Sequence, residues 1–92
     1  MKDSKIIVTI FGADKIGIVA AISQVMEKYE VNIEDISQTT MQEYFVMFMM
    51  CDIGKANAGF SEIKNAILEK AESLKMEVWV QKKEIFDKMH SI

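Results

Sequence analysis

The sequence contains no arginine, because all eleven of its basic residues are lysine. Fourteen acidic residues outnumber them and leave a formal net charge of −3. Proteins that bind nucleic acids normally present a basic surface, on which arginine makes bidentate contacts to phosphates and guanines. The absence of arginine, together with the negative charge, therefore argues against a nucleic-acid partner.

Cysteine and proline are also scarce. Cys51 is the only cysteine, so the chain has neither an internal disulfide nor the CxxC pair of a zinc site, and proline is absent. A single reduced thiol suits the cytoplasm. The apolar run near the N-terminus, residues 6–11, is too short for a signal peptide or a membrane span. We therefore expect a soluble, cytoplasmic protein with no membrane partner.

Half of the 92 residues are hydrophobic and 27% are charged, which is typical of a folded globular chain. The length predicts a single domain, residues 1–92, with a core at about residues 5–82 and a helical tail at residues 84–92. A core this small returns little more free energy than ordering the chain costs. We therefore expect a homodimer or a larger assembly of identical chains.

Hydrophobic periodicity predicts the secondary structure. Four segments have the composition or the alternation of strands: residues 6–11, 31–41, 44–51 and 76–81. Two segments repeat apolar residues at helical spacing: residues 18–29 and 60–74. Asn57 is placed to cap the second of these helices.

The second predicted strand has a break in its alternation. Val31 and Ile33 are two residues apart, but the next apolar residue is Ile36. A strand with a period of two cannot keep all three on one face without an extra residue. We therefore expect a β-bulge at Glu34–Asp35.

The first and third predicted strands are apolar on both faces, whereas the second and fourth are polar on one. Strands of the first kind belong inside a sheet, and alternating strands belong at its edges. With right-handed crossovers, the pattern predicts an α+β fold: a ferredoxin-like βαββαβ sandwich, antiparallel in the order 4-1-3-2, with a short C-terminal helix. The face without the two main helices then needs cover from the C-terminal helix, a second subunit or both. Trp79 is expected to pack under that tail or a partner.

Five sulfur-containing side chains lie in or near the third predicted strand: Met41, Met47, Met49, Met50 and Cys51. Strand alternation divides them between two faces, so we expect core packing rather than a soft-metal site. The single histidine, His90, is expected to face solvent and lies on a different element from Cys51. The sequence therefore offers no nucleophile–base pair, and we assign no catalytic residue, metal or cofactor.

Two segments of this chain resemble the ACT domain, a small-molecule-sensing module often attached to enzymes of amino-acid metabolism. One lies between the first strand and the first helix: Gly12-Ala13-Asp14-Lys15-Ile16-Gly17-Ile18-Val19. The other lies on the second strand: Asn32-Ile33-Glu34-Asp35-Ile36-Ser37-Gln38-Thr39. Together they look most like small bacterial and archaeal proteins made of one ACT domain, and like the ACT halves of the glycine-cleavage-system repressor. The resemblance covers essentially the whole chain.

The resemblance implies a regulatory module that binds an amino acid or a similar small molecule at a homodimer interface and modulates a partner protein. The ligand-binding residues that it implies are Gly12, Asp14, Lys15, Ile16, Gly17 and Ile18 in one subunit, with Asn32 and Ile33 in another. A glycine-bearing loop that leads into a helix also offers free N–H groups and the positive end of the helix dipole to an anion. Ile16 departs from the family pattern, which often has proline or a small polar residue there.

Other interpretations stay open at this stage. Asp14 also suits the N-cap of the first helix, and Asn32 suits the turn before the second strand. Four polar side chains suit an edge strand or a dimer contact: Asp35, Ser37, Gln38 and Thr39. For the whole protein, the alternatives are a ligand-free oligomerisation module and a small ferredoxin-like enzyme. An acylphosphatase-like enzyme would need an arginine for its phosphate, and there is none.

Overall fold

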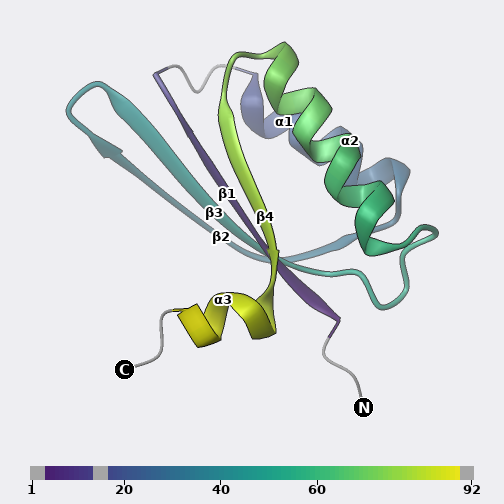
Figure 1. Ribbon diagram of the computed structural model, residues 1–92. Helices are drawn as coiled ribbons and strands as arrows, with labels where there is room; N and C mark the ends of the chain where they lie inside the picture. The colour runs from purple at the N-terminus through teal and green to yellow at the C-terminus, as the bar shows by residue number, and fades with distance from the viewer. Residues whose placement is uncertain (1–3, 14–16, 90–92) are drawn as a thin grey trace.

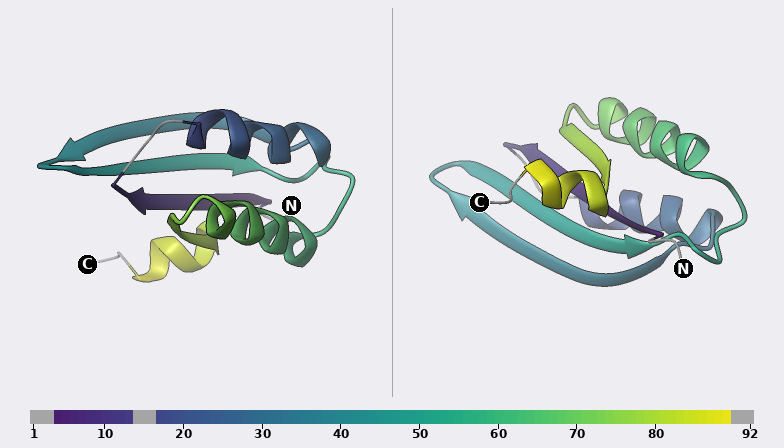
Figure 2. Two further views of the ribbon diagram at one scale, coloured as in Figure 1. Left: turned by 90° about the horizontal axis from the view of Figure 1, so that it is seen from above. Right: turned by 60° about the horizontal axis from the view of Figure 1, so that its bottom comes forward.

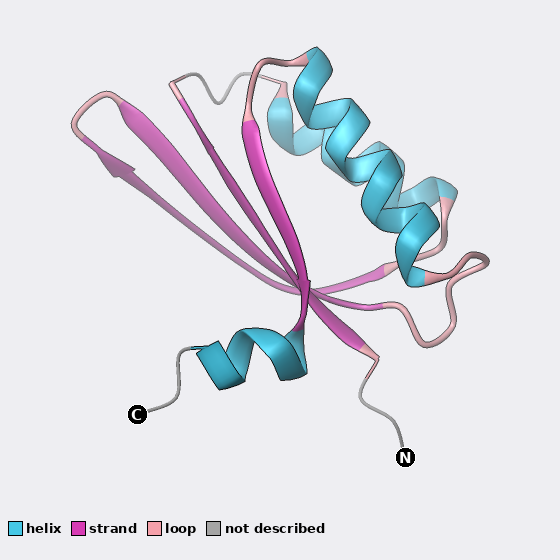
Figure 3. Cartoon of the chain, in the orientation of Figure 1, coloured by secondary structure: helices cyan, strands magenta, loops and turns pink. Residues whose placement is uncertain are grey.

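The computed structural model describes residues 4–13 and 17–89. The elements are β1 (Lys5–Gly12), α1 (Ile18–Lys28), β2 (Asn32–Met41), β3 (Tyr44–Asp52), α2 (Phe60–Ser73), β4 (Glu77–Lys82) and α3 (Lys83–Met89). The strands form one antiparallel sheet in the order β2-β3-β1-β4. α1 and α2 lie together on one side of the twisted sheet, and α3 lies below its other side (Figures 1 and 3). The predicted fold, strand order and C-terminal helix are confirmed.

The core lies between the sheet and the pair α1 and α2. Alternate residues of β1 and β3 point into it, and both helices present their apolar stripe to the same layer. Its side chains, each at most 3% exposed, include Ile6, Val8, Ile10, Ile22, Phe45, Met47, Met49 and Ile67. No polar or charged side chain is buried among the described residues. Core packing is thus confirmed for Met47, Met49 and Cys51.

The predicted bulge in β2 is present. Ile33 pairs with Cys51 and Asp35 pairs with Met50, so Glu34 is the extra residue in the ladder. The insertion changes the phase of β2, and Ile36 then lies opposite Met49 on the helix-covered face. The bulge therefore lets the apolar residues on both sides of it face the same layer.

Both main helices end in the same hydrogen-bond motif, which shortens two predicted strands by a residue. Val31 and Met76 were assigned to strands, but the Val31 N–H bonds to the Met26 carbonyl (2.8 Å) and the Met76 N–H to the Ala71 carbonyl (2.9 Å). The residue before each of them has a positive φ: 58° at Glu30 after α1 and 61° at Lys75 after α2. These are Schellman motifs, in which an apolar residue after the helix packs back on its last turn.

Two further predictions about single side chains are wrong. Asn57 does not cap α2, whose N-cap is Gly59. Its Nδ2 instead donates to the carbonyl oxygen of Lys28 (3.1 Å), which ties the loop before α2 to the end of α1. Met41 is not in the core but 65% exposed, because the hairpin between β2 and β3 extends beyond the helices (Figure 2).

No helix among residues 4–13 and 17–89 is long and apolar enough to cross a membrane. His90 lies outside the described residues.

Candidate small-molecule site

Gly12, the first residue of the predicted ligand loop, has a clear packing role. It ends β1 on the face that the helices cover, opposite Phe45 of β3. A Cβ atom at this position would lie 2.6 Å from Cε of Met76 and closer still to its Sδ. A larger residue would therefore have to displace the Met76 side chain, which is only 8% exposed.

Gly17 occupies the N-cap position of α1 and has a left-handed backbone, with φ 81° and ψ −12°. L-residues with a side chain adopt this conformation only at a cost, so glycine is favoured. A Cβ atom here would meet no heavy atom within 4 Å. The space beside the Gly17 Cα is therefore open, and the first turn of α1 contains no acidic residue that would repel an anion.

The remaining loop residues divide into two groups. Asp14, Lys15 and Ile16 lie outside the described residues, so their roles stay predictions. Ile18 begins α1, and its side chain is 1% exposed and belongs to the core. Only the backbone of Ile18 is available to a ligand.

Asn32 and Ile33 begin β2 at the opposite end of the sheet. Asn32 pairs with Asp52 of β3, which in turn pairs with Lys5 at the start of β1. Gly12 is the last residue of β1, a strand of eight residues. At about 3.3 Å per residue, the two motifs lie roughly 20 Å apart in one chain. Figure 1 shows this separation: β1 ends near the top of the sheet, and β2 begins near the foot of the helices. Among the described residues, one chain therefore does not bring the two predicted site segments together.

The Asn32 end of the sheet is held by charged contacts. The Ser4 hydroxyl donates to Oδ1 of Asp52 (2.5 Å), and the Gly54 N–H donates to the same oxygen (2.8 Å). These two hydrogen bonds, helped by nearby lysines, hold the pKa of Asp52 below its ordinary value. Lys5 Nζ forms an ion pair with Oε1 of Glu34 in the bulge (2.6 Å). These contacts hold the start of β2 in place, and the Asn32 side chain is exposed there.

Cys51 of β3 pairs with Ile33 near the start of β2 and is fully buried. Burial raises the pKa of its thiol to about 12, and the nearby Glu34 carboxylate adds to the rise. The thiol is therefore protonated at neutral pH. Because the thiolate is the nucleophilic and metal-binding form, this environment suits packing rather than chemistry.

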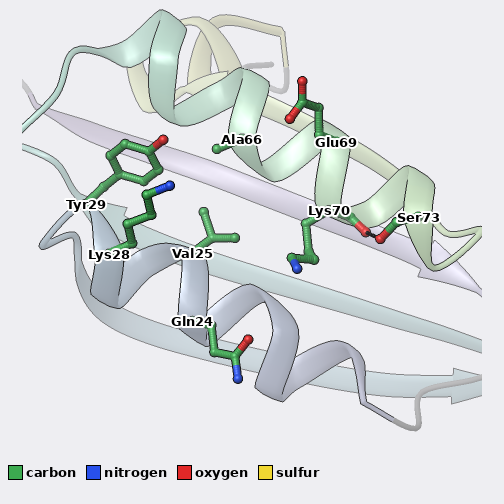
Figure 4. Close-up of a pocket in the computed structure, with 8 residues that line it drawn as sticks. All are labelled: Gln24, Val25, Lys28, Tyr29, Ala66, Glu69, Lys70 and Ser73. Carbon is green, nitrogen blue, oxygen red and sulfur yellow. Dashed lines mark hydrogen bonds between the residues drawn. The ribbon is translucent and has the colours of Figure 1, made fainter.

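A groove of about 470 Å³ lies between α1 and α2, and no sequence signal pointed to it. Figure 4 shows the floor formed by Val25 and Ala66, with polar side chains around it. Two of these are lysines and one is Glu69, and Lys28 Nζ lies 5.4 Å from the ring centroid of Tyr29. The rim thus has mixed charge and no buried polar group aimed inward. Val25 of α1 and Ala66 of α2 are the apolar lining residues of the groove.

Comparison with known proteins gives a consistent result. The family described as "ACT domain" matches residues 4–81. A UPF0237 protein of Methanosarcina acetivorans is 44% identical over 92 residues, which is 100% of both chains. A UPF0237 protein of Listeria innocua is 41% identical over 86 residues, or 94% of this chain and 97% of the relative.

Solved structures agree with the sequence relatives. An ACT domain protein from Streptococcus pneumoniae superposes with a TM-score of 0.78 at 34% identity, covering 90% of this chain and 93% of that one. A putative glycine cleavage system transcriptional repressor superposes with a TM-score of 0.71 at 14% identity, covering 84% of this chain and 44% of that one. The second likeness is one of fold alone.

Proposed function

This chain belongs to the ACT domain family, and from that premise we propose that it is a cytoplasmic regulatory module, not an enzyme, which binds an amino acid or a similar small molecule between two identical subunits. Ligand occupancy then changes how the assembly acts on a partner protein. The observation that carries the proposal is the position of the two predicted site segments, which lie at opposite ends of one sheet.

The edge of β2 offers a way to bring the segments together. β2 is an edge strand, and its residues from Glu34 to Met41 are exposed. If two β2 strands pair in antiparallel fashion, Asn32 of one subunit lies beside the Met41 end of the other. Met41 pairs with Tyr44, at the same end of the sheet as Gly12. A two-fold axis at this edge would therefore place the loop of each subunit near Asn32 of its partner.

The chemistry of such a site suits an amino acid. The open N-terminus of α1 at Gly17 offers N–H groups and a positive dipole end to a carboxylate. The Asn32 amide carries both a donor and an acceptor, so it is able to orient an ammonium or a carboxylate group. A ligand held by both subunits binds the dimer more tightly than the monomer, and binding is then coupled to assembly.

A ligand screen tests the proposal. We expect at least one of the twenty amino acids to raise the melting temperature, and calorimetry to confirm binding with one ligand per loop. Asn32→Ala should weaken that binding by about 1 to 3 kcal/mol, because a buried polar partner is lost. Gly17→Asn should also weaken it, since asparagine tolerates the left-handed backbone but adds a side chain at the open N-terminus.

Gln24→Ala is the matched control, because Gln24 is an exposed polar residue of the groove between α1 and α2. If Gln24→Ala weakens binding and Asn32→Ala does not, the ligand occupies the groove and the proposed site is wrong. All three variants must first show the parent's circular dichroism spectrum and oligomeric state.

A module that assembles without any ligand is the second candidate. The observation that favours it is a group of exposed aromatic side chains on the sheet, which suits a protein contact rather than a small-molecule pocket: Phe11, Tyr44, Phe48 and Trp79. If no amino acid changes the melting temperature while the protein is oligomeric, this second function is supported and the first is contradicted.

A further inference from the structure

The sheet surface opposite α1 and α2, which we call the open face, carries four exposed aromatic side chains. Their exposed fractions are 36% for Phe11, 47% for Tyr44, 41% for Phe48 and 51% for Trp79. Phe11 and Tyr44 are stacked, with ring centroids 5.2 Å apart. Phe48 and Trp79 lie on either side of Thr9 in neighbouring strands. The four side chains therefore form one apolar surface across three strands.

α3 does not cover this surface. It has seven residues and is about 10 Å long, whereas the open-face residues of β3 extend over about 20 Å. α3 lies near the lower end of the sheet, where Phe86 lines a cavity of about 150 Å³ together with Ile7, Phe48 and Met50 (Figure 1). None of its described residues is buried, and Met89 is 63% exposed. The helix thus covers one end of the open face loosely, with Phe48 beside it, and leaves Phe11, Tyr44 and Trp79 exposed.

We propose that the open face is a self-association surface, on which a second copy of this chain packs sheet against sheet. This contact is separate from the β2 edge invoked for ligand binding, because an edge and a face of one sheet point in different directions. It stands whether or not a ligand binds. If both contacts form, the assembly is a tetramer.

The exposed area agrees with this occupant. At about 200 Å² per aromatic side chain, the four residues expose about 350 Å² between them. A stable interface needs about 500 Å² or more from each partner. Met41 in the row beside Tyr44, and Ile85 and Met89 on α3, are 48% to 65% exposed and supply further apolar area. The open face therefore reaches the size of a small dimer interface.

Charge and shape favour a second copy over a nucleic acid or an anionic membrane. Two acidic residues lie on the open face away from the end where Lys5 pairs with Asp52: Asp35 on β2 and Glu77 at the start of β4. Both would repel phosphates. Small side chains alternate with the aromatic rings, since Phe48 lies between Ser37 and Thr9. Aromatic rings of one copy are thus able to pack over the small side chains of another, as in the interior of a β-sandwich.

α3 restricts how two copies meet. It projects from the open face at the end near Ile7. If two copies overlapped at this end of their sheets, their α3 helices would collide. An arrangement with the two α3 helices at opposite ends leaves the aromatic parts free to overlap. α3 therefore excludes the first arrangement of the two copies and leaves the second.

The experiment compares Phe48→Glu with Leu74→Glu by sedimentation from about 1 to about 100 µM protein, the range expected for an interface of this size. Leu74, 39% exposed, matches Phe48 in exposure but caps α2 on the other side of the sheet. We expect Phe48→Glu to halve the mass of the parent assembly and Leu74→Glu to leave it unchanged. Equal masses for the parent and Phe48→Glu, or a monomeric parent at the highest concentration, would overturn the proposal.

Trp79 provides an independent readout, because it is the single tryptophan. In the parent, its acrylamide quenching should fall as the protein concentration rises. In Phe48→Glu, quenching should be high at every concentration. Tyr44→Glu serves as a second variant if Phe48→Glu does not fold. A parent whose quenching is independent of concentration, while its mass changes, would show that assembly uses another surface and that the proposal is wrong.

Discussion

Gly12→Ala should destabilise the protein although the backbone at this position accepts alanine. Among the described residues, the only glycine with a positive φ is Gly17, so Gly12 carries no conformational strain. The added methyl group would instead lie 2.6 Å from Cε of Met76 and closer to Sδ. Met76 is flexible but 8% exposed, and its side chain must move within a packed layer.

The size of the effect follows from this geometry. Overpacking of a core by one methyl group costs about 1 to 3 kcal/mol, and the flexible end of a methionine places this case in the lower half. A domain of 92 residues has a free energy of unfolding of about 5 to 14 kcal/mol. A loss of 1 to 2 kcal/mol should therefore lower the melting temperature by roughly 4 to 16 °C.

A double-mutant cycle with Met76→Ala, measured by urea unfolding, isolates the cause. Met76→Ala removes both atoms that the new methyl group meets, and by itself costs about 2 to 5 kcal/mol. In the double variant, Gly12→Ala should add nothing to that cost, so the coupling free energy equals the cost of Gly12→Ala alone. Gly59→Ala is the control, because no atom lies within 4 Å of its Cβ position. Additive costs in the cycle would refute the proposed contact.

Three further predictions concern Gly17, Cys51 and Asp52. Gly17→Ala should lower the free energy of unfolding by about 1 kcal/mol through its positive φ, and Gly17→Asn by less, as measured in urea. The raised pKa of the Cys51 thiol means that the unfolded chain ionises first, so stability should fall as pH rises above 9.0, and Cys51→Ala should lessen that fall. The lowered pKa of Asp52 means that its contribution is present at neutral pH and is lost as pH falls below 3.8 through its folded pKa; Ser4→Ala should reduce that loss in acid unfolding curves. A Cys51→Ala or Ser4→Ala profile that parallels the parent's would contradict the corresponding cause.

The order and type of the elements could be predicted from the sequence because they depend on local periodicity. Alternation in β1 and β3, and helical spacing in α1 and α2, determine which side of each element is apolar. The phase break between Ile33 and Ile36 likewise contained enough information to predict the bulge. The helix ends were less predictable, because Glu30 and Lys75 adopt a left-handed conformation that glycine usually occupies.

The tertiary structure decided which distant residues meet. It tied Asn57 to the end of α1, left Met41 exposed, and limited α3 to one end of the open face. It also placed Gly12 and Asn32 at opposite ends of the sheet. Such distances depend on strand register and on the relative lengths of elements, which are set by pairing between segments far apart in the chain. Periodicity determines which face of each segment is buried. Only the pairing of the strands in the completed sheet determines which residues of different segments lie near one another.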